Sequence, residues 1–270
     1  MKLTIITINY NNLEGLKQTF DSVFKQTFQD FDYIVIDGGS TDGSKAYIEA
    51  HQDKLYYWLS EKDNGVYNAM NKGILKANGE YLNFMNSGDV FYDSNVLDKV
   101  FSSNINQDII YGDNMVNYGN RLEKEIPPAF LSFEFLMETC VNHQSTFFKR
   151  SLFSNSFLYS EDLKISSDWE FFAYNIIIKG ATYKKIDEII CIYDKLGFSS
   201  QKENFQLYLD EREVCKQKHF SFFLNHKDPL LEKISFKRKK DIDAISRNKT
   251  LFRLLKWQID FLKLFVSKKV

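Results

Sequence analysis

Three aspartates of this chain, Asp37, Asp89 and Asp113, each follow an apolar run of strand length. The carboxyl ends of parallel strands are where open α/β sheets bind their ligands. Carboxylates placed there would repel a phosphate group unless a cation lies between them. Mg²⁺ or Mn²⁺ suits that role, because each binds one or two carboxylates together with the oxygens of a substrate phosphate. The pattern therefore predicts a divalent cation and a ligand that carries phosphate.

The surroundings of Asp89 make it the first candidate for the metal. Residues 80–85 predict a buried strand that runs out into the polar stretch Asn86-Ser-Gly-Asp89. A strand end is a rigid mount for a charged group, and a glycine there allows close approach of backbone and ligand. Asn86 is the second candidate ligand. The alternative is that Asp89 caps a helix over 94–100, and the local pattern favours neither.

The elements that must position these groups alternate regularly along the first ninety residues. Apolar and β-branched runs predict strands over 3–8, 33–36, 56–59 and 80–85. Apolar residues at helical spacing predict helices between them, over 13–26, 44–52 and 66–77. This order implies a parallel sheet that is covered by helices on both faces.

The second half of the chain gives a looser pattern. It predicts strands over 108–111 and 143–148, a strand pair over 182–193, and helices over 168–178 and 202–219. No GxGxxG turn follows the first strand and no GxxxxGK[ST] motif occurs, so neither a dinucleotide-binding Rossmann site nor a P-loop is expected.

Composition limits the class of protein. The chain has 270 residues, of which 44% are hydrophobic, enough for one large domain or one domain with an appendage. Its three cysteines are far apart and lack CxxC spacing, which argues against a disulfide framework or a zinc site and for a reducing compartment. Residues 1–9 lack the features of a signal peptide, and no run is long enough to span a bilayer. We therefore expect a cytoplasmic protein.

Charge is distributed unevenly. The net charge is −1, but residues 233–270 hold twelve Lys or Arg and three Asp, a net of +9. Residues 251–266 also place Leu and Phe on one face, as helices that lie on anionic membranes do. We predict a basic amphipathic tail over 226–270 that binds an anionic membrane surface; packing against the rest of the chain is the alternative. Nucleic acid is not expected as a partner, since no known binding module accompanies the basic run.

Four motifs in order resemble the family 2 glycosyltransferases: Thr7-Ile-Asn-Tyr-Asn11, Asp37-Gly-Gly-Ser-Thr-Asp-Gly43, Asp63-Asn-Gly-Val-Tyr-Asn-Ala-Met-Asn-Lys-Gly73 and Asn86-Ser-Gly-Asp89. The resemblance runs through roughly residues 3–195. It implies an α/β fold of the GT-A type, with a Rossmann-like, mostly parallel central sheet flanked by helices. It also implies a nucleotide-sugar donor and transfer with inversion at the anomeric carbon.

The resemblance assigns donor-binding roles to the first half of the chain. Its implied contacts are with the nucleotide, its base, the ribose and the diphosphate, through Thr7, Asn9, Tyr10, Asp37, Asp63, Lys72, Ser87 and Gly88. For Asp37 the alternative is turn chemistry in Asp-Gly-Gly. Two motifs depart from the family: Asn86 and Gly88 stand where it usually has further aspartates, and Met70 stands for a common arginine. Lys72 can replace that arginine only as a point charge.

The resemblance also points to residues of the second half. Ser166-Ser-Asp-Trp-Glu170 is similar to the family's acidic motif, with Asp168 in the position of the base and Glu170 as the second choice. An aspartate with an ordinary pKa of about 3.9 is ionised at neutral pH, as a base must be, although capping of the helix is the alternative. His143 and Gln144 match a stretch implied to contact donor sugar or phosphates. A hydrogen-bonded core histidine is the alternative there, and Asp113 is assigned either to the sugar or to structural pairing.

We predict a glycosyltransferase that moves a sugar from a nucleotide-diphosphate sugar to a hydroxyl of a glycan or lipid-linked glycan, with inversion. Surface polysaccharide synthesis at the inner face of the cell membrane is the expected setting. Residues 1–225 form the predicted catalytic domain, with donor binding in 1–113 and acceptor binding in 114–225. The alternatives are a non-catalytic relative that binds nucleotide sugar, and a glycoside hydrolase with paired carboxylates.

Overall fold

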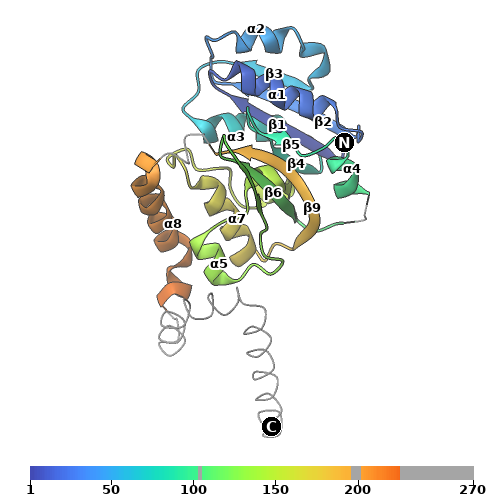
Figure 1. Ribbon diagram of the computed structural model, residues 1–270. Helices are drawn as coiled ribbons and strands as arrows, with labels where there is room; N and C mark the ends of the chain where they lie inside the picture. The colour runs from blue at the N-terminus through green and yellow to red at the C-terminus, as the bar shows by residue number, and fades with distance from the viewer. Residues whose placement is uncertain (103–104, 196–201, 226–270) are drawn as a thin grey trace, which may run out of the picture. The chain divides into compact units, whose positions relative to one another are not determined.

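A computed structural model of the protein describes residues 1–102, 105–195 and 202–225 (Figure 1). The chain divides into two compact units, Met1–Lys216 and Gln217–Val270. The sheet and the candidate site belong to the first unit. The predicted amphipathic tail over 226–270 lies outside the described residues, and its boundary with the catalytic domain stays a prediction.

The first half of the chain alternates strands and helices as predicted. Its elements are β1 (Leu3–Asn9), α1 (Leu13–Phe24), β2 (Phe31–Asp37), α2 (Ser44–Glu49), the short 3₁₀ turn Gln52–Lys54, β3 (Tyr57–Ser60), α3 (Val66–Lys76) and β4 (Tyr81–Phe84). The four strands are parallel, in the order β3-β2-β1-β4. Asn9 and Asp37 are register partners at the carboxyl ends of β1 and β2.

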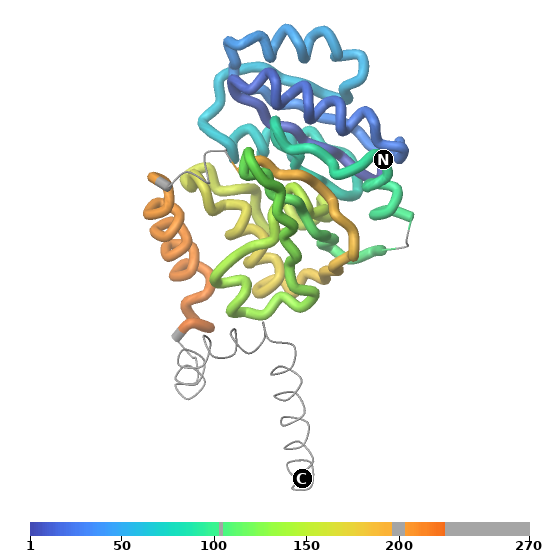
Figure 2. Tube along the Cα trace, viewed as in Figure 1, coloured from blue at the N-terminus to red at the C-terminus, as the bar shows by residue number. Residues whose placement is uncertain are grey.

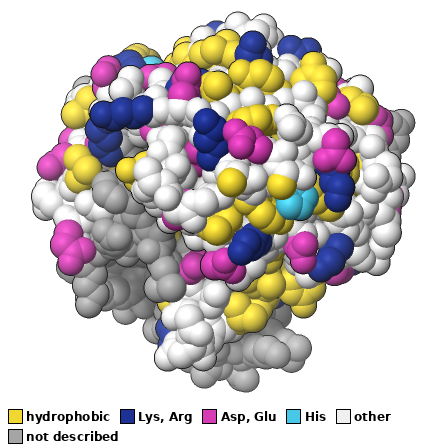
Figure 3. Space-filling view, turned by 90° about the horizontal axis from the view of Figure 1, so that it is seen from above, with side chains coloured by type: hydrophobic (Ala, Val, Ile, Leu, Met, Phe, Trp, Pro, Cys, Tyr) yellow, Lys and Arg dark blue, Asp and Glu magenta, His cyan; other side chains and the backbone are white. Residues whose placement is uncertain are grey.

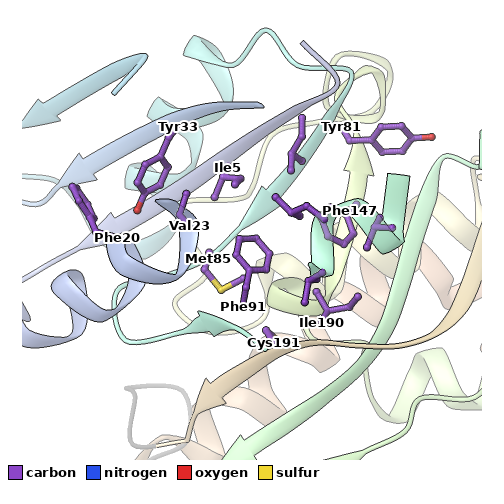
Figure 4. Close-up of a cluster of buried hydrophobic side chains, with 14 of the residues drawn as sticks. Ile5, Phe20, Val23, Tyr33, Tyr81, Met85, Phe91, Phe147, Ile190 and Cys191 are labelled. Carbon is purple, nitrogen blue, oxygen red and sulfur yellow. The ribbon is translucent and has the colours of Figure 1, made fainter. Parts of the chain in front are cut away.

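Both faces of this parallel half are covered. Ile5 of β1 is buried in one cluster with Phe20 of α1, drawn in Figure 4, whereas a side chain on Gly73 of α3 would collide with Ile6. Burial on both faces explains the continuous apolar runs of β1 and β2. The helix α1 is capped by Asn12, whose Oδ1 accepts a hydrogen bond from the backbone N–H of Gly15.

The second half extends the same sheet with mixed pairing. Its elements are β5 (Val90–Phe91), α4 (Val96–Phe101), β6 (Ile109–Asn117), β7 (Leu122–Glu125), α5 (Phe133–Glu138), the 3₁₀ turn His143–Ser145, β8 (Thr146–Lys149), α6 (Ser151–Asn155), α7 (Ser167–Ile177), β9 (Tyr183–Asp194), the 3₁₀ turn Lys202–Asn204 and α8 (Phe205–Asn225). The sheet continues β4-β8-β6-β9-β5, and β7 pairs with β6. Here β8 is antiparallel to both neighbours, and β9 is parallel to β6.

Two predictions for this half were wrong in detail. The strand pair expected over 182–193 is one strand, β9, which runs beside β6 in Figure 2 and then pairs with β5. The strand expected over 143–148 starts only at Thr146, after the 3₁₀ turn. Both differences concern the site, because β9 ends at Asp194 and the turn holds His143.

The hydrophobic cluster of Figure 4 joins the two halves of the sheet. Met85 and Phe91, on either side of the Asn86–Asp89 loop, are buried with Phe147 of β8 and Cys191 of β9. The loop is thereby anchored at both ends by apolar burial. The surface differs from this apolar core. The face seen in Figure 3 carries acidic and basic side chains side by side, and exposed ion pairs lie along α1 and α2.

Candidate active site

Two cavities adjoin at the carboxyl ends of β1, β2 and β4. The larger has a volume of about 600 Å³ and is lined by Ile8, Asn9, Tyr10, Asn12, Gly38, Gly39, Lys62, Asp63, Gly65, Val66, Ala69, Asn86 and Ser87. The smaller has about 360 Å³ and is lined by Asn12, Val66, Tyr67, Asn86, Ser87, Asp89, His143, Gln144, Lys164, Ile165, Asp168, Tyr193 and Asp194. Asn12, Val66, Asn86 and Ser87 line both. The two therefore form one site in two parts.

Asp37 lies next to residues that line the larger cavity. It is completely buried, and its carboxylate accepts hydrogen bonds from Asn9 Nδ2 at 2.8 Å, Ser60 Oγ at 2.6 Å, and both Oγ and N of Ser40 at 2.5 and 3.0 Å. Burial opposes ionisation, but these four donors outweigh it and lower the pKa of Asp37. Asp37 itself does not line the cavity; the following Gly38 and Gly39 do.

Tyr10, Gly38 and Asp63 form a wall of the larger cavity. A side chain at position 38 would meet the Asp63 carboxylate at 2.6 Å and the Tyr10 ring at 3.2 Å, so it would displace the Asp63 side chain. Tyr10 is 68% exposed, which leaves its ring open to a ligand. Asn9 contributes a buried oxygen, Oδ1, that has no hydrogen-bond partner among the described residues.

Besides Asp37, three of the predicted donor-binding residues line neither cavity. Thr7 is fully buried, and its hydroxyl donates to the carbonyl of Met85 at 2.7 Å. Lys72 forms an ion pair with Glu61 at 2.8 Å. Gly88 has φ of +104°, a conformation that favours glycine whether or not a ligand is near, and its N–H donates to Thr19. The structure gives each of these residues a role within the fold.

Asp113 also stands apart from both cavities. Its carboxylate is buried between Lys124 of β7 at 2.8 Å and Lys185 of β9 at 2.9 Å. Burial disfavours its charge, but the two lysines outweigh burial and lower its pKa. Of the two interpretations of Asp113, the arrangement matches structural pairing.

Asp89 lies inside the smaller cavity with few hydrogen-bond donors. It is 5% exposed and accepts hydrogen bonds from Gln144 Nε2 at 3.0 Å and from the backbone N–H of Asp194 at 3.1 Å. Burial outweighs these bonds and raises the pKa of Asp89 to about 6. It precedes β5 and does not cap α4, whose N-cap is Asn95. The capping alternative is thus excluded.

Asp168 lies in the first turn of α7 and faces the same cavity. Its Oδ2 accepts from His143 Nδ1 at 2.9 Å, and its Oδ1 accepts from Tyr67 Oη at 3.1 Å and from Trp169 N at 2.8 Å. Burial opposes its charge, but these donors, His143 first, lower its pKa. The side chain keeps 24% exposure. Glu170, the second choice for a base, is 1% exposed and lines neither cavity.

A comparison with known families identifies the family to which the chain belongs. The model of "Glycosyl transferase family 2" matches residues 4–157, more than half of the chain. This chain belongs to glycosyltransferase family 2.

Relatives agree with the family. An uncharacterized glycosyltransferase of Mycobacterium tuberculosis is 31% identical over 221 residues, which cover 78% of this chain and 82% of the relative. A PGL/p-HBAD biosynthesis glycosyltransferase of Mycobacterium bovis is 30% identical over 174 residues, covering 62% of this chain and 67% of the relative.

Solved structures agree in fold. The S. aureus TarS fragment 1–349 in complex with UDP-GlcNAc matches with a TM-score of 0.63 and 19% identity, over 82% of this chain and 68% of that one. Of a longer TarS chain the match covers 37%. The mannosyltransferase PcManGT from Pyrobaculum calidifontis, in complex with GDP-Man and Mn²⁺, matches with a TM-score of 0.57 and 14% identity, over 96% of this chain and 80% of that one. The glycosyltransferase fold is of the GT-A type, as expected.

The residues of this glycosyltransferase fit a divalent cation only in part. Asn86 Oδ1 is a buried oxygen without a hydrogen-bond partner among the described residues, and Asp89 lies in the same cavity. No group of three or more His, Cys, Asp or Glu that could hold a metal occurs in the described part of the chain. A cation that keeps few protein ligands and takes the rest from substrate phosphates, as Mg²⁺ and Mn²⁺ do, fits this donor set.

The sequence did not reveal several residues of the two cavities: Lys62, Tyr67, Lys164, Tyr193 and Asp194. For Asp194 a signal existed, because it follows the apolar run of β9 just as Asp37 follows β2. No role was predicted for Asp194, although the strand pair expected over 182–193 ends one residue before it. Lys62 and Lys164 sit in loops and carry no pattern that separates them from other surface lysines.

Proposed function

We propose that this glycosyltransferase is an inverting hexosyltransferase. It moves a hexosyl group from a nucleotide-diphosphate sugar to a hydroxyl of a glycan or lipid-linked glycan, in surface polysaccharide synthesis. One observation carries the proposal: Asp89 and Asp168, which lie 79 positions apart in the sequence, line one cavity beside the larger one. Asp89 can bind the cation that neutralises the leaving diphosphate, and Asp168 can accept the proton of the attacking hydroxyl.

The larger cavity suits the nucleoside diphosphate. Its volume of about 600 Å³ is in the range of small-molecule sites, and its wall offers the exposed ring of Tyr10 and the carboxylate of Asp63. The unpartnered oxygen of Asn9 can accept a hydrogen bond from the ligand. Two of the matched solved structures hold UDP-GlcNAc and GDP-Man, which supports a nucleotide-sugar donor here.

Asp89 and Asn86 would hold the divalent cation at the junction of the two cavities. When bound, the cation supplies charge that neutralises the leaving diphosphate. A cation bound there would lower the pKa of Asp89 from its raised value of about 6, since a neighbouring positive charge favours the charged form. Mn²⁺ in the PcManGT complex supports the choice of metal.

Asp168 acts as the general base. Its carboxylate takes the proton of the acceptor hydroxyl while that oxygen bonds to the anomeric carbon. The bond from this carbon to the diphosphate oxygen breaks on the opposite face, and its electron pair leaves with the diphosphate. Attack from the opposite face inverts the configuration. Positioned proton transfer of this kind contributes about 10²–10⁴-fold to the rate.

The setting at the membrane is part of the proposal. Within residues 1–102, 105–195 and 202–225 no helix is both long and apolar enough to cross a bilayer. The +9 charge of residues 233–270 supports peripheral binding to an anionic inner membrane surface.

The variant Asp168→Asn tests the proposal, because it keeps the shape of the side chain and removes its capacity to accept a proton. We expect turnover, measured as release of nucleoside diphosphate, to fall by about 10²–10⁴-fold. Donor binding, measured by calorimetry after a screen of nucleotide sugars with Mn²⁺, should stay within twofold. Turnover that survives the substitution would rule out Asp168 as the base. A product with retained anomeric configuration would rule out inversion.

A further inference from the structure

We propose that His143 is a positioning residue of the transfer reaction. Its imidazole determines which oxygen of Asp168 receives the acceptor proton, and it holds the side-chain amide of Asn86 in the orientation that presents Oδ1 to the donor. The proposal rests on the proposed function, because it takes Asp168 as the base.

The first step concerns the lone pairs of Asp168. An ionised carboxylate offers about four lone-pair sites, two on each oxygen. Oδ1 already accepts from Tyr67 Oη and from the backbone N–H of Trp169, so both of its sites are in use. Among the described residues Oδ2 accepts only from His143, at 2.9 Å. The free lone pair on Oδ2 is therefore the place for the acceptor proton.

The second step concerns the tautomer of His143. A carboxylate can only accept hydrogen bonds, so the Nδ1 that faces Asp168 carries the hydrogen. The other nitrogen, Nε2, faces Asn86 Nδ2 at 3.1 Å, and an amide nitrogen can only donate, so Nε2 accepts and carries no hydrogen. The charge of Asp168 thus sets the hydrogen on Nδ1, and the amide of Asn86 sets the acceptor at Nε2.

The third step concerns the other end of the Asn86 amide. With Nδ2 held by the ring, Oδ1 points away from it, and this oxygen is buried without a hydrogen-bond partner among the described residues. Asn86 lines both cavities. The imidazole of His143 thus orients Asp168, the proton acceptor, on one side. On the other side it orients Asn86, whose unpartnered Oδ1 is presented to the sugar donor.

The ring is held firmly enough to do this. His143 opens the 3₁₀ turn before β8, and the turn is pinned because the carbonyl of Asn142 accepts from Ser145 and Thr146. Its ring packs edge-on against Phe84 at a centroid distance of 6.4 Å, and the side chain is 16% exposed. A side chain held by packing and by a hydrogen bond at each nitrogen loses little mobility when substrate binds.

Other groups also act on the charge of Asp168. The titratable and charged side chains around it are Tyr67 of α3, Cys140 and His143 of the α5–β8 segment, Tyr159, Tyr208 and Arg212 of α8, and Lys164, Asp89 and Asp194 across the cavity. Of these, His143 and Tyr67 donate hydrogen bonds to its carboxylate. A change at His143 therefore acts on the base directly.

Two substitutions at position 143 separate the two contacts of the ring. In His143→Asn the amide nitrogen takes about the place of Nδ1 and keeps the bond to Asp168. In His143→Gln the amide reaches the place of Nε2, and the bond to Asp168 is lost. We expect kcat of His143→Gln to fall about 10- to 100-fold. The acid limb of its pH–rate profile should move to higher pH, since a carboxylate that loses a donor has a higher pKa. His143→Asn should keep both within a few-fold and weaken binding of the metal-dependent donor instead.

His51→Gln is the matched control. His51 is also half-buried, also bonds through Nδ1, to the carbonyl of Tyr47 at 2.8 Å, and also packs among aromatic rings. It lines neither cavity, so its pH–rate profile should equal that of the unchanged protein. A profile that shifts in this control would show that the readout reports a general effect of losing an imidazole.

The outcomes distinguish this inference from the proposed function. Turnover that survives Asp168→Asn overturns the base and, with it, the proposal. Loss of turnover in Asp168→Asn with an unchanged kcat and acid limb in His143→Gln leaves the base standing and overturns the role of His143. Equal losses in His143→Asn and His143→Gln without a pH shift overturn it as well.

A spectroscopic measurement needs no folded variant at position 143. The ¹⁵N chemical shifts of the unchanged protein, assigned to His143 by the missing signal in any soluble position-143 variant, should show hydrogen on Nδ1 and none on Nε2. A ring that carries hydrogen on Nε2, alone or together with Nδ1, would overturn the proposal.

Discussion

Asp37 and Asp89 occupy similar places and behave in opposite ways. Asp37 ends β2 and Asp89 follows β4 in the parallel half of the sheet, and each is almost fully buried, at 0% and 5% exposure. Asp37 accepts four hydrogen bonds and its pKa is lowered, whereas Asp89 accepts two and its pKa is raised to about 6. Their exposed fractions are similar, and the balance between desolvation and hydrogen bonds decides: the four donors prevail at Asp37, and desolvation prevails at Asp89. Asp37 is a permanent anion of the fold, and Asp89 is an anion that still requires a positive partner.

Asp168 lies between these two cases. It accepts three hydrogen bonds, retains 24% exposure, and has a lowered pKa. The three aspartates thus differ in the number of hydrogen bonds that each carboxylate accepts, and we assign each a different role. The following substitutions test this ranking by number of donors, from the largest expected effect to the smallest.

Removing the charge of Asp89 should have the largest effect. We expect Asp89→Asn to lose about 10²–10³-fold in turnover with Mn²⁺, because the charge that holds the cation at the leaving group is gone. Stabilisation by Mn²⁺ together with a nucleoside diphosphate, measured by thermal unfolding, should disappear as well. Asp93→Asn, four residues away and outside both cavities, is the control and should keep full turnover. Full activity of Asp89→Asn would end the assignment of Asp89 to the metal.

The pH dependence of stability should separate Asp37 from Asp89 in sign. The pKa of Asp89 is about 6 in the folded protein and about 3.9 in the unfolded chain, so burying its charge costs free energy above pH 6 and nothing below pH 4. Asp89→Asn should therefore raise the free energy of unfolding at pH 7.5, relative to its effect at pH 4, by about 2–3 kcal/mol.

For Asp37 the sign is reversed. Its lowered pKa means that it stabilises the fold above pH 4, and this contribution is lost as the pH falls through the folded-state pKa. Asp37→Asn should therefore cost more at pH 7.5 than at the lowest pH at which the protein remains folded. Urea unfolding in the presence of a chelator measures both variants. If the two substitutions changed the free energy of unfolding with pH in the same direction, the proposed opposite pKa shifts of Asp37 and Asp89 would be contradicted.

Tyr67→Phe should give the smallest effect. It leaves Asp168 with two donors, and the backbone N–H of Trp169 stays on the same oxygen. We expect a fall in kcat of about 3- to 10-fold and a slight upward shift of the acid limb. The same steady-state measurement of nucleoside diphosphate release serves here. A loss as large as that of His143→Gln would show that the two oxygens of Asp168 are equivalent.

Sequence predicted the parallel half of the fold and the outline of the site. The runs of β1, β2 and β4 are buried on both faces, so their apolar character is continuous and their ends are visible as polar residues. Asp89 was predicted from such a strand end and Asp168 from the order of the family motifs, and both line the smaller cavity. Thr7 and Lys72 resembled binding residues, but their partners, Met85 and Glu61, are fixed by folding.

What sequence could not supply are the long-range hydrogen bonds. Tyr67 and Asp168 are 101 positions apart, and Asp89 and the N–H of Asp194 are 105 apart. Nothing local marks either pair. Asp113 shows the same limit, since the two lysines that hold it come from β7 and β9. Strand ends can be located from apolar runs, whereas the donors that set the charge of each carboxylate depend on tertiary structure.

The bond from Tyr67 to Asp168 has a consequence for recombining this chain with its relatives. Tyr67 belongs to α3, in the segment that borders the larger cavity, and Asp168 belongs to α7, far along the chain. A chimera that takes its first 113 residues from one parent and the rest from another would divide this pair between parents. Exchanges meant to change acceptor choice should therefore match the residue at position 67 to the incoming helix.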